Sequence, residues 1–540
     1  MNRIHPLLAG LGLATAIAAQ TLTPAPGLTF LDPIATNRGA LWDDSGTIVH
    51  VWPFTSQPGV SSYLAQNGDV LRSCYTGQDG PGLGGRVERV AFDGRVLWSY
   101  VPPLPGTQHH DIHEMPNGNV LMIVTDELTP AQALALGQNP LVASGLVADQ
   151  VIEVRPTGPT SGEIVWRWRA IDHLVQSFNA ARPNFGVVAN RRERIHINYP
   201  PPPQPTTGLW LHMNCVDYNP DLDQIVVSCR NWNELWVIDH STTTQQAAGS
   251  TGGRYGRGGD LLYRWGNPAA YGTAGTQHLM GQHDVHWIPP GRPGAGNLIC
   301  FNNLKGTLLG LGAASAVTEL VPAVDPGGNY PFTQGAPFGP AAPVWEYLAP
   351  VPTDFFSAIV SSADRLPNGN TLVCSGTQNH VFELGLNDQI VWEVDESMTF
   401  KARRYERSLW QDADKALTHP GDSVGFHLLA GTEHAGEFYF LGGSASGTDP
   451  GTTLFGVQVP LNLDPYMLTA TGSALLPGSI GQLDPLGRGR ASFVLPPLVA
   501  DAFDGLVLHH AFVSFDGGGG VSHVSNPVGL ELVGLRIDDL

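Results

Sequence analysis

The sequence predicts an all-β protein. Its 540 residues include 65 glycines and 44 prolines, and only 14% of the residues are charged. Short apolar runs separated by Gly, Pro, Asn and Asp dominate the chain, and no long stretch keeps the apolar period of an amphipathic helix. This pattern is typical of many short strands joined by tight turns. The length is sufficient for one large and one small domain.

The N-terminal residues 1–19 have the pattern of a secretory signal peptide. Arg3 precedes an apolar run over 7–19, and Ala16-Ile17-Ala18 provides a small-residue cleavage site. The run is too short and too interrupted by glycine to span a bilayer. A buried first strand is the alternative interpretation. We therefore expect a periplasmic or secreted protein with no membrane span.

One strand pattern recurs between residues 46 and 394. Each copy is a tight turn followed by an aliphatic run with an aromatic residue at or near its end, at 46–52, 94–100, 162–168, 259–265, 342–347 and 388–394. Asn-Gly hairpin turns follow several of these copies. Six repeats of this kind predict a six-bladed β-propeller with four strands in each blade. Two stacked β-sandwiches are the main alternative.

The two ends of the repeat region are expected to meet in one blade. The inner-hairpin pattern appears only five times, so we expect the sixth inner strand near 400–409 and the outer strands of that blade within 39–52. This interlock leaves no free sheet edge. The propeller is thus expected over 20–415. Short alternating strands over 416–540 predict a small C-terminal β-sandwich with an accessory role.

Charge and cysteine content restrict the possible functions. The net charge of −20 and the absence of a basic stripe disfavour nucleic acid as a partner. The chain has only three lysines, Lys305, Lys401 and Lys415, so an anion-binding site must use Arg, His and backbone N–H groups. Five cysteines without a CxxC motif are expected to be buried apolar side chains.

Histidines occur where the inner strands are expected to begin. These residues are His109, His110, His113, His212, His283 and His286. In a propeller the equivalent ends of the inner strands converge on one face, and aligning the turns places His110 against His283 and His113 against His286. Residues three apart on a strand point to opposite faces unless a bulge intervenes. Metal binding by the His-Asp-x-His stretches is therefore the less favoured interpretation, and structural hydrogen bonding is a further alternative for His113 and His286.

The hairpin after His212 is expected to turn at Asp221, which places Arg230 opposite His212 on the same face as Asn214. A guanidinium beside two polar inner-strand residues indicates an anion site. A surface or interblade salt bridge is the alternative for Arg230.

Together these stretches resemble the PAPS-independent arylsulfate sulfotransferases, a family of six-bladed propellers. The matching stretches lie between 38 and 394 and include His109-His110-Asp111, His212-x-Asn214, Ser228-Cys229-Arg230-Asn231 and Gln282-His283-Asp284. The resemblance implies that His283 is transiently sulfurylated and that His110, His212, Asn214 and Arg230 bind the sulfuryl group, with His109 as the alternative to His110. It implies transfer from a phenolic sulfate ester to a phenolic acceptor without cofactor or metal. The family's Lys-Thr pair has no lysine counterpart at 355–362.

The chemistry of these residues fits such a transfer. A neutral imidazole is a competent nucleophile near pH 7, and a covalent intermediate predicts ping-pong kinetics. Arg230, His212 and Asn214 can donate hydrogen bonds to sulfuryl oxygens, and His110 can donate likewise or protonate the departing phenolate. We therefore predict His283, His110, His212 and Arg230 as catalytic residues, with Asn214 and His109 binding substrate. A non-catalytic propeller that binds an anionic or aromatic ligand and a His-cluster metal-dependent enzyme are the alternatives.

Overall fold

The structure, a computed structural model, describes residues 23–534 except 66, 78–83, 104, 141–144, 200–208, 419–420 and 497–502. The expected signal peptide lies outside the described residues. Strands predominate, as predicted, and the α-helices found in this part of the chain are short: α1 (Pro130–Ala135), α2 (Thr244–Ala247), α3 (Lys305–Leu309) and α4 (Pro465–Ala470). None of these described helices has the length and apolarity that a bilayer crossing demands.

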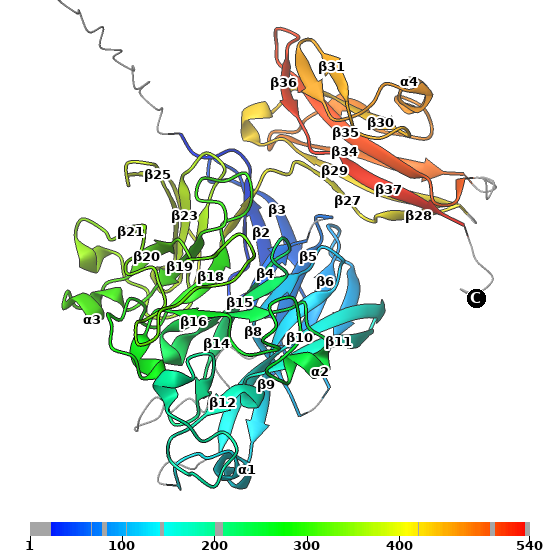
Figure 1. The fold of residues 1–540 in the computed structure, drawn as a ribbon. Helices are drawn as coiled ribbons and strands as arrows, with labels where there is room; N and C mark the ends of the chain where they lie inside the picture. The colour runs from blue at the N-terminus through cyan, green and yellow to red at the C-terminus, as the bar shows by residue number, and fades with distance from the viewer. Residues whose placement is uncertain are drawn as a thin grey trace, which may run out of the picture.

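Six antiparallel four-stranded sheets make up the larger part of the molecule (Figure 1). The first sheet contains β4 (Pro58–Leu64), β5 (Val70–Tyr75), β6 (Gly85–Val90) and β7 (Val96–Tyr100). The second contains β8 (Gln108–Glu114), β9 (Val120–Leu128), β10 (Leu146–Gly158) and β11 (Ser161–Arg169). The third contains β14 (Met213–Asn219), β15 (Gln224–Cys229), β16 (Glu234–Asp239) and β17 (Tyr263–Trp265).

The remaining three sheets follow the same antiparallel order. The fourth contains β18 (His283–Trp287), β19 (Leu298–Asn302), β20 (Ala316–Leu320) and β21 (Trp345–Tyr347). The fifth contains β22 (Ser362–Arg365), β23 (Thr371–Ser375), β24 (His380–Leu384) and β25 (Ile390–Asp395). The sixth contains β26 (Arg403–Tyr405), β1 (Leu28–Leu31), β2 (Arg38–Trp42) and β3 (Ile48–Pro53). First strands of successive sheets contact one another, as β8 contacts β14 and β14 contacts β18.

The recurring aromatic strand is the outermost strand of each of these sheets, and in four of them its tryptophan donates a hydrogen bond to the next sheet. The indole nitrogen of Trp52 donates to the Ala91 carbonyl at 3.1 Å, and that of Trp98 donates to Ser161 at 2.9 Å. Trp168 donates to Gly259 at 2.7 Å and Trp265 to Pro340 at 2.9 Å. Each ring is buried while its N–H finds a partner, which is how tryptophan stabilises an interface between layers. The repeated motif therefore encodes contacts between sheets.

The predicted meeting of the two ends of the repeat region is confirmed, although the N-terminal segment supplies three strands and the first of them, β1, precedes the expected range 39–52. β26 pairs with β1, β1 pairs with β2, and β2 pairs with β3 in one sheet. The chain thus uses its N-terminal strands to complete a sheet whose first strand lies more than three hundred residues later. All five cysteines are buried, as predicted, and all five are free thiols.

Two further sheets, formed from Leu409 onward, enclose a separate hydrophobic cluster that includes Phe426, Phe493 and Phe512. The smaller contains β27 (Leu409–Gln411), β29 (Asp422–Leu429) and β34 (Arg488–Leu495). The larger contains β28 (Lys415–Leu417), β37 (Val528–Val533), β35 (Val507–Phe515), β30 (Phe438–Ser444) and β33 (Ile480–Gln482), with β36 (Val521–Val524) pairing on β35. Two short pairs lie elsewhere: β12 (Leu174–Val175) with β13 (Ile195–His196), and β31 (Thr452–Leu454) with β32 (Val457–Val459).

The C-terminal sheets contact turns at one end of the strands in the six-sheet part. The Thr432 hydroxyl donates to Asp43 at 2.8 Å, Arg95 donates to the Asp412 carbonyl at 3.1 Å, and Arg407 donates to the Asn67 carbonyl at 3.1 Å. Asp43, Asn67 and Arg95 all lie in turns opposite the end at which β8, β14 and β18 begin. We call the latter end the histidine end. It faces away from the C-terminal sheets (Figure 1).

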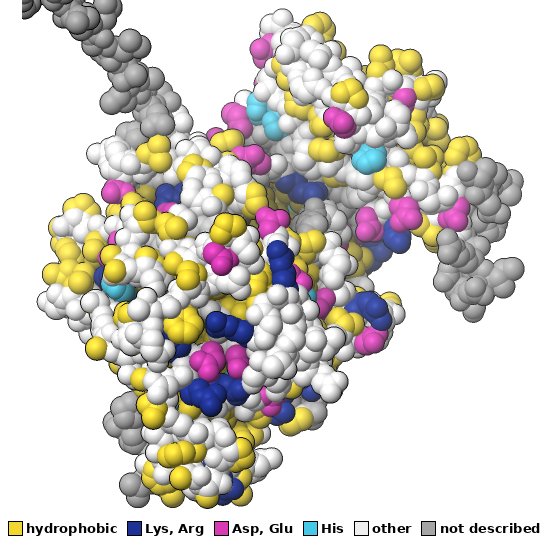
Figure 2. Space-filling view, viewed as in Figure 1, with side chains coloured by type: hydrophobic (Ala, Val, Ile, Leu, Met, Phe, Trp, Pro, Cys, Tyr) yellow, Lys and Arg dark blue, Asp and Glu magenta, His cyan; other side chains and the backbone are white. Residues whose placement is uncertain are grey.

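Basic and acidic side chains alternate on the face of the molecule drawn in Figure 2, and no continuous basic stripe is visible on that face.

Candidate active site

Irregular strand pairing at the histidine end positions three histidines. The register between β8 and β9 shifts between Gln108 and Ile112, that between β14 and β15 shifts between Met213 and Cys215, and that between β18 and β19 shifts between His283 and His286. The bulges bend the strands and re-aim their side chains. His110 (φ 52°) and His212 (φ 54°) lie in the left-handed region, which is costly for residues other than glycine. The fold therefore holds these imidazoles in place at the expense of local strain.

The structure brings His110, His212, His283 and Arg230 together. The ring centroids of His110 and His212 are 4.6 Å apart. The Arg230 guanidinium lies near the turn before His283, because a Cβ atom at Gly281 would be 4.0 Å from Arg230 Nη2. The positive charge of Arg230 contributes to lowering the pKa of all three imidazoles. Residues from three separate sheets thus converge at the histidine end, as the sequence predicted.

Arg230 lies opposite His212, although the hairpin between them has a different register from the one expected. Val216 pairs with Val227 and Asn219 with Gln224, so the hairpin is centred between Asp221 and Leu222 rather than on Asp221. The bulge at Asn214 restores the expected alignment, and the Arg230 N–H donates to the His212 carbonyl at 3.2 Å. Asn214 extends to the neighbouring sheet, where its amide donates to the Gln282 carbonyl at 2.8 Å.

Asn303 fixes the tautomer of His283. The Asn303 amide nitrogen donates to the carbonyls of Ser357 at 2.8 Å and Val360 at 3.0 Å. Its oxygen must therefore accept, and it lies 2.8 Å from His283 Nδ1. A neutral His283 consequently carries its proton on Nδ1 and keeps the lone pair on Nε2. The sequence analysis did not identify Asn303, although it lies two residues beyond Phe301, the cross-strand partner of His283.

All three imidazoles are held neutral. Burial, followed by the charge of Arg230, lowers the pKa of His283 to about 3. Burial and the neighbouring basic groups His212, His109, His283 and Arg230 lower the pKa of His110 well below its ordinary value. Burial and Arg230 do the same for the pKa of His212. The cluster is therefore a group of uncharged nitrogens beside one permanent cation near neutral pH.

His109 points to a different partner. Its Nε2 lies 2.9 Å from Asp149 Oδ1, and its Nδ1 lies 2.9 Å from His110 Nδ1. The other Asp149 oxygen accepts from the Met213 N–H at 2.9 Å. Both ring nitrogens of His109 are thus occupied by protein groups, so neither is available to bind substrate as the sequence analysis expected. Asp149 lies in no recognisable sequence motif, and it was not among the site residues predicted from the sequence.

A buried lysine connects the strands just beyond the histidines. Lys401 Nζ is 2.7 Å from Asp111 Oδ2 and 3.1 Å from Asp284 Oδ1, and these carboxylates directly follow His110 and His283 in the chain. Although burial favours the neutral amine, Asp111 and the other anionic neighbours raise the pKa of Lys401 well above its ordinary value. Lys401 is therefore a charged brace between two histidine-bearing strands.

The opposite end of these strands, which we call the carboxylate end, pairs its histidines with acids. His113 Nδ1 lies 3.1 Å from Asp217 Oδ1, and His286 Nε2 lies 3.6 Å from Asp364 Oδ1. Although a bulge does intervene in β8, His113 and His110 contact different groups. Within the described residues no group of three or more His, Cys, Asp or Glu side chains is arranged to hold a metal ion.

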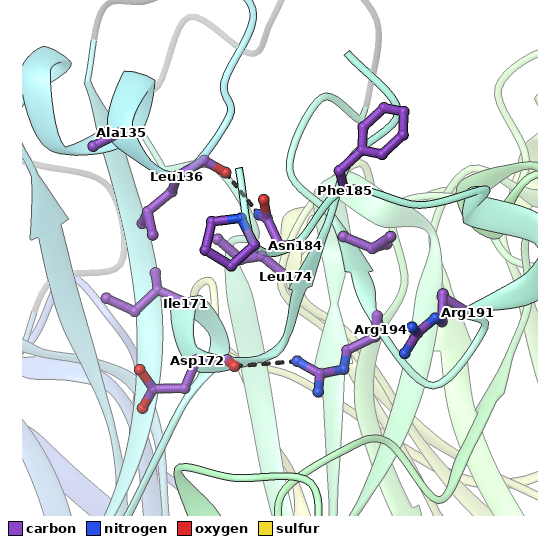
Figure 3. A pocket seen from close by; sticks show the side chains of 11 residues that line it. Ala135, Leu136, Ile171, Asp172, Leu174, Asn184, Phe185, Arg191 and Arg194 are labelled. Atoms are coloured by element: carbon purple, nitrogen blue, oxygen red, sulfur yellow. Dashed lines mark hydrogen bonds between the residues drawn. The ribbon is translucent and has the colours of Figure 1, made fainter. Parts of the chain in front are cut away.

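A cavity of about 310 Å³ lies among loops that leave their sheets at the histidine end (Figure 3). Leu136 and Ile171 line one side, and Arg191 and Arg194 line the other. Arg194 Nη1 donates to the Asp172 carbonyl at 3.4 Å and its Nε lies 3.1 Å from Asp260. The cavity thus combines an apolar wall with basic side chains.

Comparison with solved structures finds distant similarities. A periplasmic gluconolactonase from Pseudomonas aeruginosa is 13% identical, with 70% of this chain and 99% of that chain covered and a TM-score of 0.35. A protein from Lactobacillus plantarum is 10% identical, with 94% and 97% covered and a TM-score of 0.34. A virginiamycin B lyase from Staphylococcus aureus is 10% identical, with 69% and 82% covered and a TM-score of 0.34.

The comparison with curated proteins finds no match. The family model described as Arylsulfotransferase (ASST) matches residues 15–403. This range contains His109, His110, His212, Asn214, Arg230 and His283, and it covers most of the chain. The protein therefore belongs to the arylsulfotransferase (ASST) family.

Proposed function

We propose that the protein transfers a sulfuryl group from a phenolic sulfate ester to a phenolic acceptor through a sulfohistidine at His283 Nε2. Family membership supports arylsulfotransferase activity in general. The observation that carries the histidine mechanism is the contact between Asn303 Oδ1 and His283 Nδ1, which leaves Nε2 unprotonated in a neutral ring beside Arg230. A nucleophile with an available lone pair next to a fixed cation is what attack on an anionic ester requires.

In the first half-reaction, His283 Nε2 attacks sulfur and the bond from sulfur to the phenolic oxygen breaks. The electron pair of that bond leaves with the phenolic oxygen, and His283 retains its Nδ1 proton against Asn303. The sulfuryl group then carries a negative charge on an imidazolium ring. In the second half-reaction the acceptor oxygen attacks sulfur, and the N–S electron pair returns to Nε2. Two displacements through one intermediate give ping-pong kinetics.

The remaining residues stabilise charge on the sulfuryl oxygens. Transfer of this group, like phosphoryl transfer, depends on in-line positioning and on donors directed at the equatorial oxygens. Arg230 supplies a guanidinium, and Asn214 has a second amide N–H beyond the one donated to Gln282. His212 Nδ1 is buried and has no hydrogen-bond partner among the described residues. We assign His212, Asn214 and Arg230 to the sulfuryl oxygens and His110 to the phenolic oxygen.

We further infer that the six four-stranded sheets are the blades of one six-bladed propeller and that the C-terminal sheets are an accessory β-sandwich. The change from one to the other lies between β26 and β27, a few residues before the expected boundary at 416. Residues 1–19 are proposed as a signal peptide for export to the periplasm or the medium. The substrates are small molecules, and the C-terminal sheets leave the histidine end open to them.

Intact-mass spectrometry after mixing with p-nitrophenyl sulfate tests the proposal. We expect a gain of one sulfuryl group, located on a peptide that contains His283, with loss of the adduct when a phenol is added. Release of nitrophenol without an adduct at His283 contradicts the proposed intermediate. Binding of aryl sulfates without any release of nitrophenol favours the non-catalytic alternative.

A further inference from the structure

We propose that Asp149, His109 and His110 form a proton relay that delivers a proton to the phenolic oxygen of the donor and takes one from the phenolic acceptor. His110 contacts the substrate oxygen, whereas His109 and Asp149 are positioning residues behind it. The inference rests on the proposed sulfuryl transfer and assigns the acid–base groups of that reaction.

The direction of each hydrogen bond in the relay follows by elimination. Asp149 accepts at both oxygens, from the Met213 N–H at 2.9 Å and from His109 Nε2 at 2.9 Å, as an ionised carboxylate does. The His109 proton is therefore on Nε2, and its Nδ1 has only a lone pair. The 2.9 Å contact between the two Nδ1 atoms then requires His110 to donate. Neutral His110 is left with an unprotonated Nε2.

This arrangement allows a positive charge on His110 to spread toward a carboxylate. When Nε2 accepts a proton, the Nδ1 proton can shift to His109 Nδ1, which places the charge on the ring in direct contact with Asp149. All of Asp149 and His109 is excluded from solvent, so this interaction is weakly screened. His212 differs, because its Nδ1 is buried without a partner among the described residues, and no carboxylate stands behind it there.

The donor itself supplies the electrostatic condition for protonation. Without substrate, burial and the neighbouring basic groups, of which Arg230 is permanently charged, keep the pKa of His110 low. A bound sulfate ester adds a negative charge to the same site and opposes that effect, so proton uptake by His110 accompanies donor binding.

The proton balance closes over one cycle. In the first half-reaction the S–O bond breaks, the phenolic oxygen takes the proton from His110 Nε2, and neutral phenol leaves. In the second half-reaction the acceptor hydroxyl gives its proton to His110 Nε2 while its oxygen bonds to sulfur and the N–S bond breaks. The proton taken from one acceptor is thus available for the next donor, and no other reagent is consumed.

Asp149→Asn tests the relay when two donors with different leaving groups are compared. An amide cannot accept at both positions, so the substitution either loses the Met213 bond or reverses the tautomers of both histidines. We expect the burst rate with phenyl sulfate to fall about 10- to 100-fold and that with p-nitrophenyl sulfate by less than about 3-fold, because general acid catalysis contributes about 10²- to 10⁴-fold and matters most for the more basic phenolate. The ratio of the two rates does not depend on the fraction of folded protein.

Asp217→Asn is the matched control. Asp217 likewise accepts from a histidine, His113 at 3.1 Å, and from a backbone N–H, that of Trp287 at 2.9 Å, but it lies at the carboxylate end. We expect the ratio of rates to stay unchanged in this control and to change in a second relay variant, His109→Phe, as it does in Asp149→Asn.

Equal losses with both donors in the two relay variants, or the same change of ratio in Asp217→Asn, overturn the relay while the sulfohistidine stands. A wild-type protein that forms no adduct and releases no phenol overturns the proposed function together with the relay.

Discussion

The two ends of the inner strands use the same residue type in opposite ways. At the carboxylate end, His113 and His286 face Asp217 and Asp364, and each pair joins neighbouring sheets. At the histidine end, His110, His212 and His283 face one another and Arg230, and among the described residues of this cluster only His109 contacts a carboxylate. Only two residues of one strand separate His283 from His286. The difference teaches that the position of a histidine in a repeat does not decide whether its ring faces a carboxylate or other basic side chains, and these partners set its charge state.

The largest expected effect separates these two ends directly. His283→Asn removes the proposed nucleophile, and we expect release of nitrophenol from p-nitrophenyl sulfate to fall by at least about 10⁴-fold. His286→Asn, three residues along the same strand, should retain activity near that of the unchanged protein. Circular dichroism should show the same fold in both variants. Full turnover by His283→Asn would remove the distinction between the two ends.

The next largest effect on activity is expected from Arg230 at the histidine end, with Arg292 at the carboxylate end as the comparison. Arg230→Gln removes the permanent charge beside the imidazoles, and we expect a loss of about 10²- to 10³-fold in kcat, as for removal of one oxyanion donor. Arg292→Gln is the control, because Arg292 donates to Asp364 at 2.7 Å at the carboxylate end. Steady-state kinetics with an aryl sulfate and a saturating phenol measures both. Comparable losses in the two variants contradict a special role for Arg230.

A smaller effect is expected from the residue that fixes the nucleophile. Asn303→Ala leaves His283 Nδ1 without its acceptor, so the ring can rotate and change tautomer. We expect kcat to fall about 10- to 100-fold, the size of effect that misplacement by about 1 Å produces. KM should change little, since Asn303 touches the imidazole and not the sulfuryl group. A raised KM with unchanged kcat assigns Asn303 to substrate binding instead.

The smallest effect appears in the dependence of stability on pH. The folded pKa of His283, about 3, lies below its ordinary value of 6.5, so below pH 6.5 the unfolded chain binds a proton that the folded chain does not. Stability from this group is complete above pH 6.5 and is lost as the pH falls toward 3. For His283 alone this amounts to about 2 kcal/mol at pH 5.

The carboxylate end has a different pH window. Burial favours the protonated acids, but the hydrogen bond from His113 holds the pKa of Asp217 below the ordinary 3.8, and the neighbouring His286 with the Arg292 and Arg403 guanidiniums does the same for the pKa of Asp364. Their stabilisation is present above pH 3.8 and is lost only as the pH falls through the lower folded values. Thermal unfolding at pH 7 and pH 5 should therefore show less acid destabilisation in His283→Asn than in the unchanged protein. Identical acid sensitivity contradicts a neutral buried His283.

Much of the fold and part of the site follow from local sequence patterns. Tight turns and aromatic residues at or near the strand end mark all six outermost strands, because these features recur along the sequence. The pairing of β26 with the N-terminal strands follows from a count of hairpins. His212 and Arg230 were predicted to be opposite each other, but the actual hairpin register differs by one and a bulge at Asn214 compensates for it.

The supporting residues of the site could not be predicted in the same way. Asn303 lies just after β19 and Asp149 lies within β10, and both contact histidines of other strands through single hydrogen bonds. Neither residue lies in a repeated motif. A single polar residue near a strand end can have many structural uses, so the sequence alone does not mark it as part of the site. His109 was assigned to substrate because it neighbours His110, and only the three-dimensional contact with Asp149 reveals its other role.

The pairing of the two chain ends has a consequence for biosynthesis, because Lys401 lies beside the strand that makes this pairing. This lysine lies two residues before β26, the strand that joins the two chain ends, and its ammonium holds the carboxylates that follow His110 and His283. A nascent chain that has not yet produced this segment lacks the brace between those strands. A fragment that ends before Lys401 therefore leaves Asp111 and Asp284 without their shared ammonium, so the contact between the two histidine-bearing strands depends on the last segment of the six-sheet part to be synthesised.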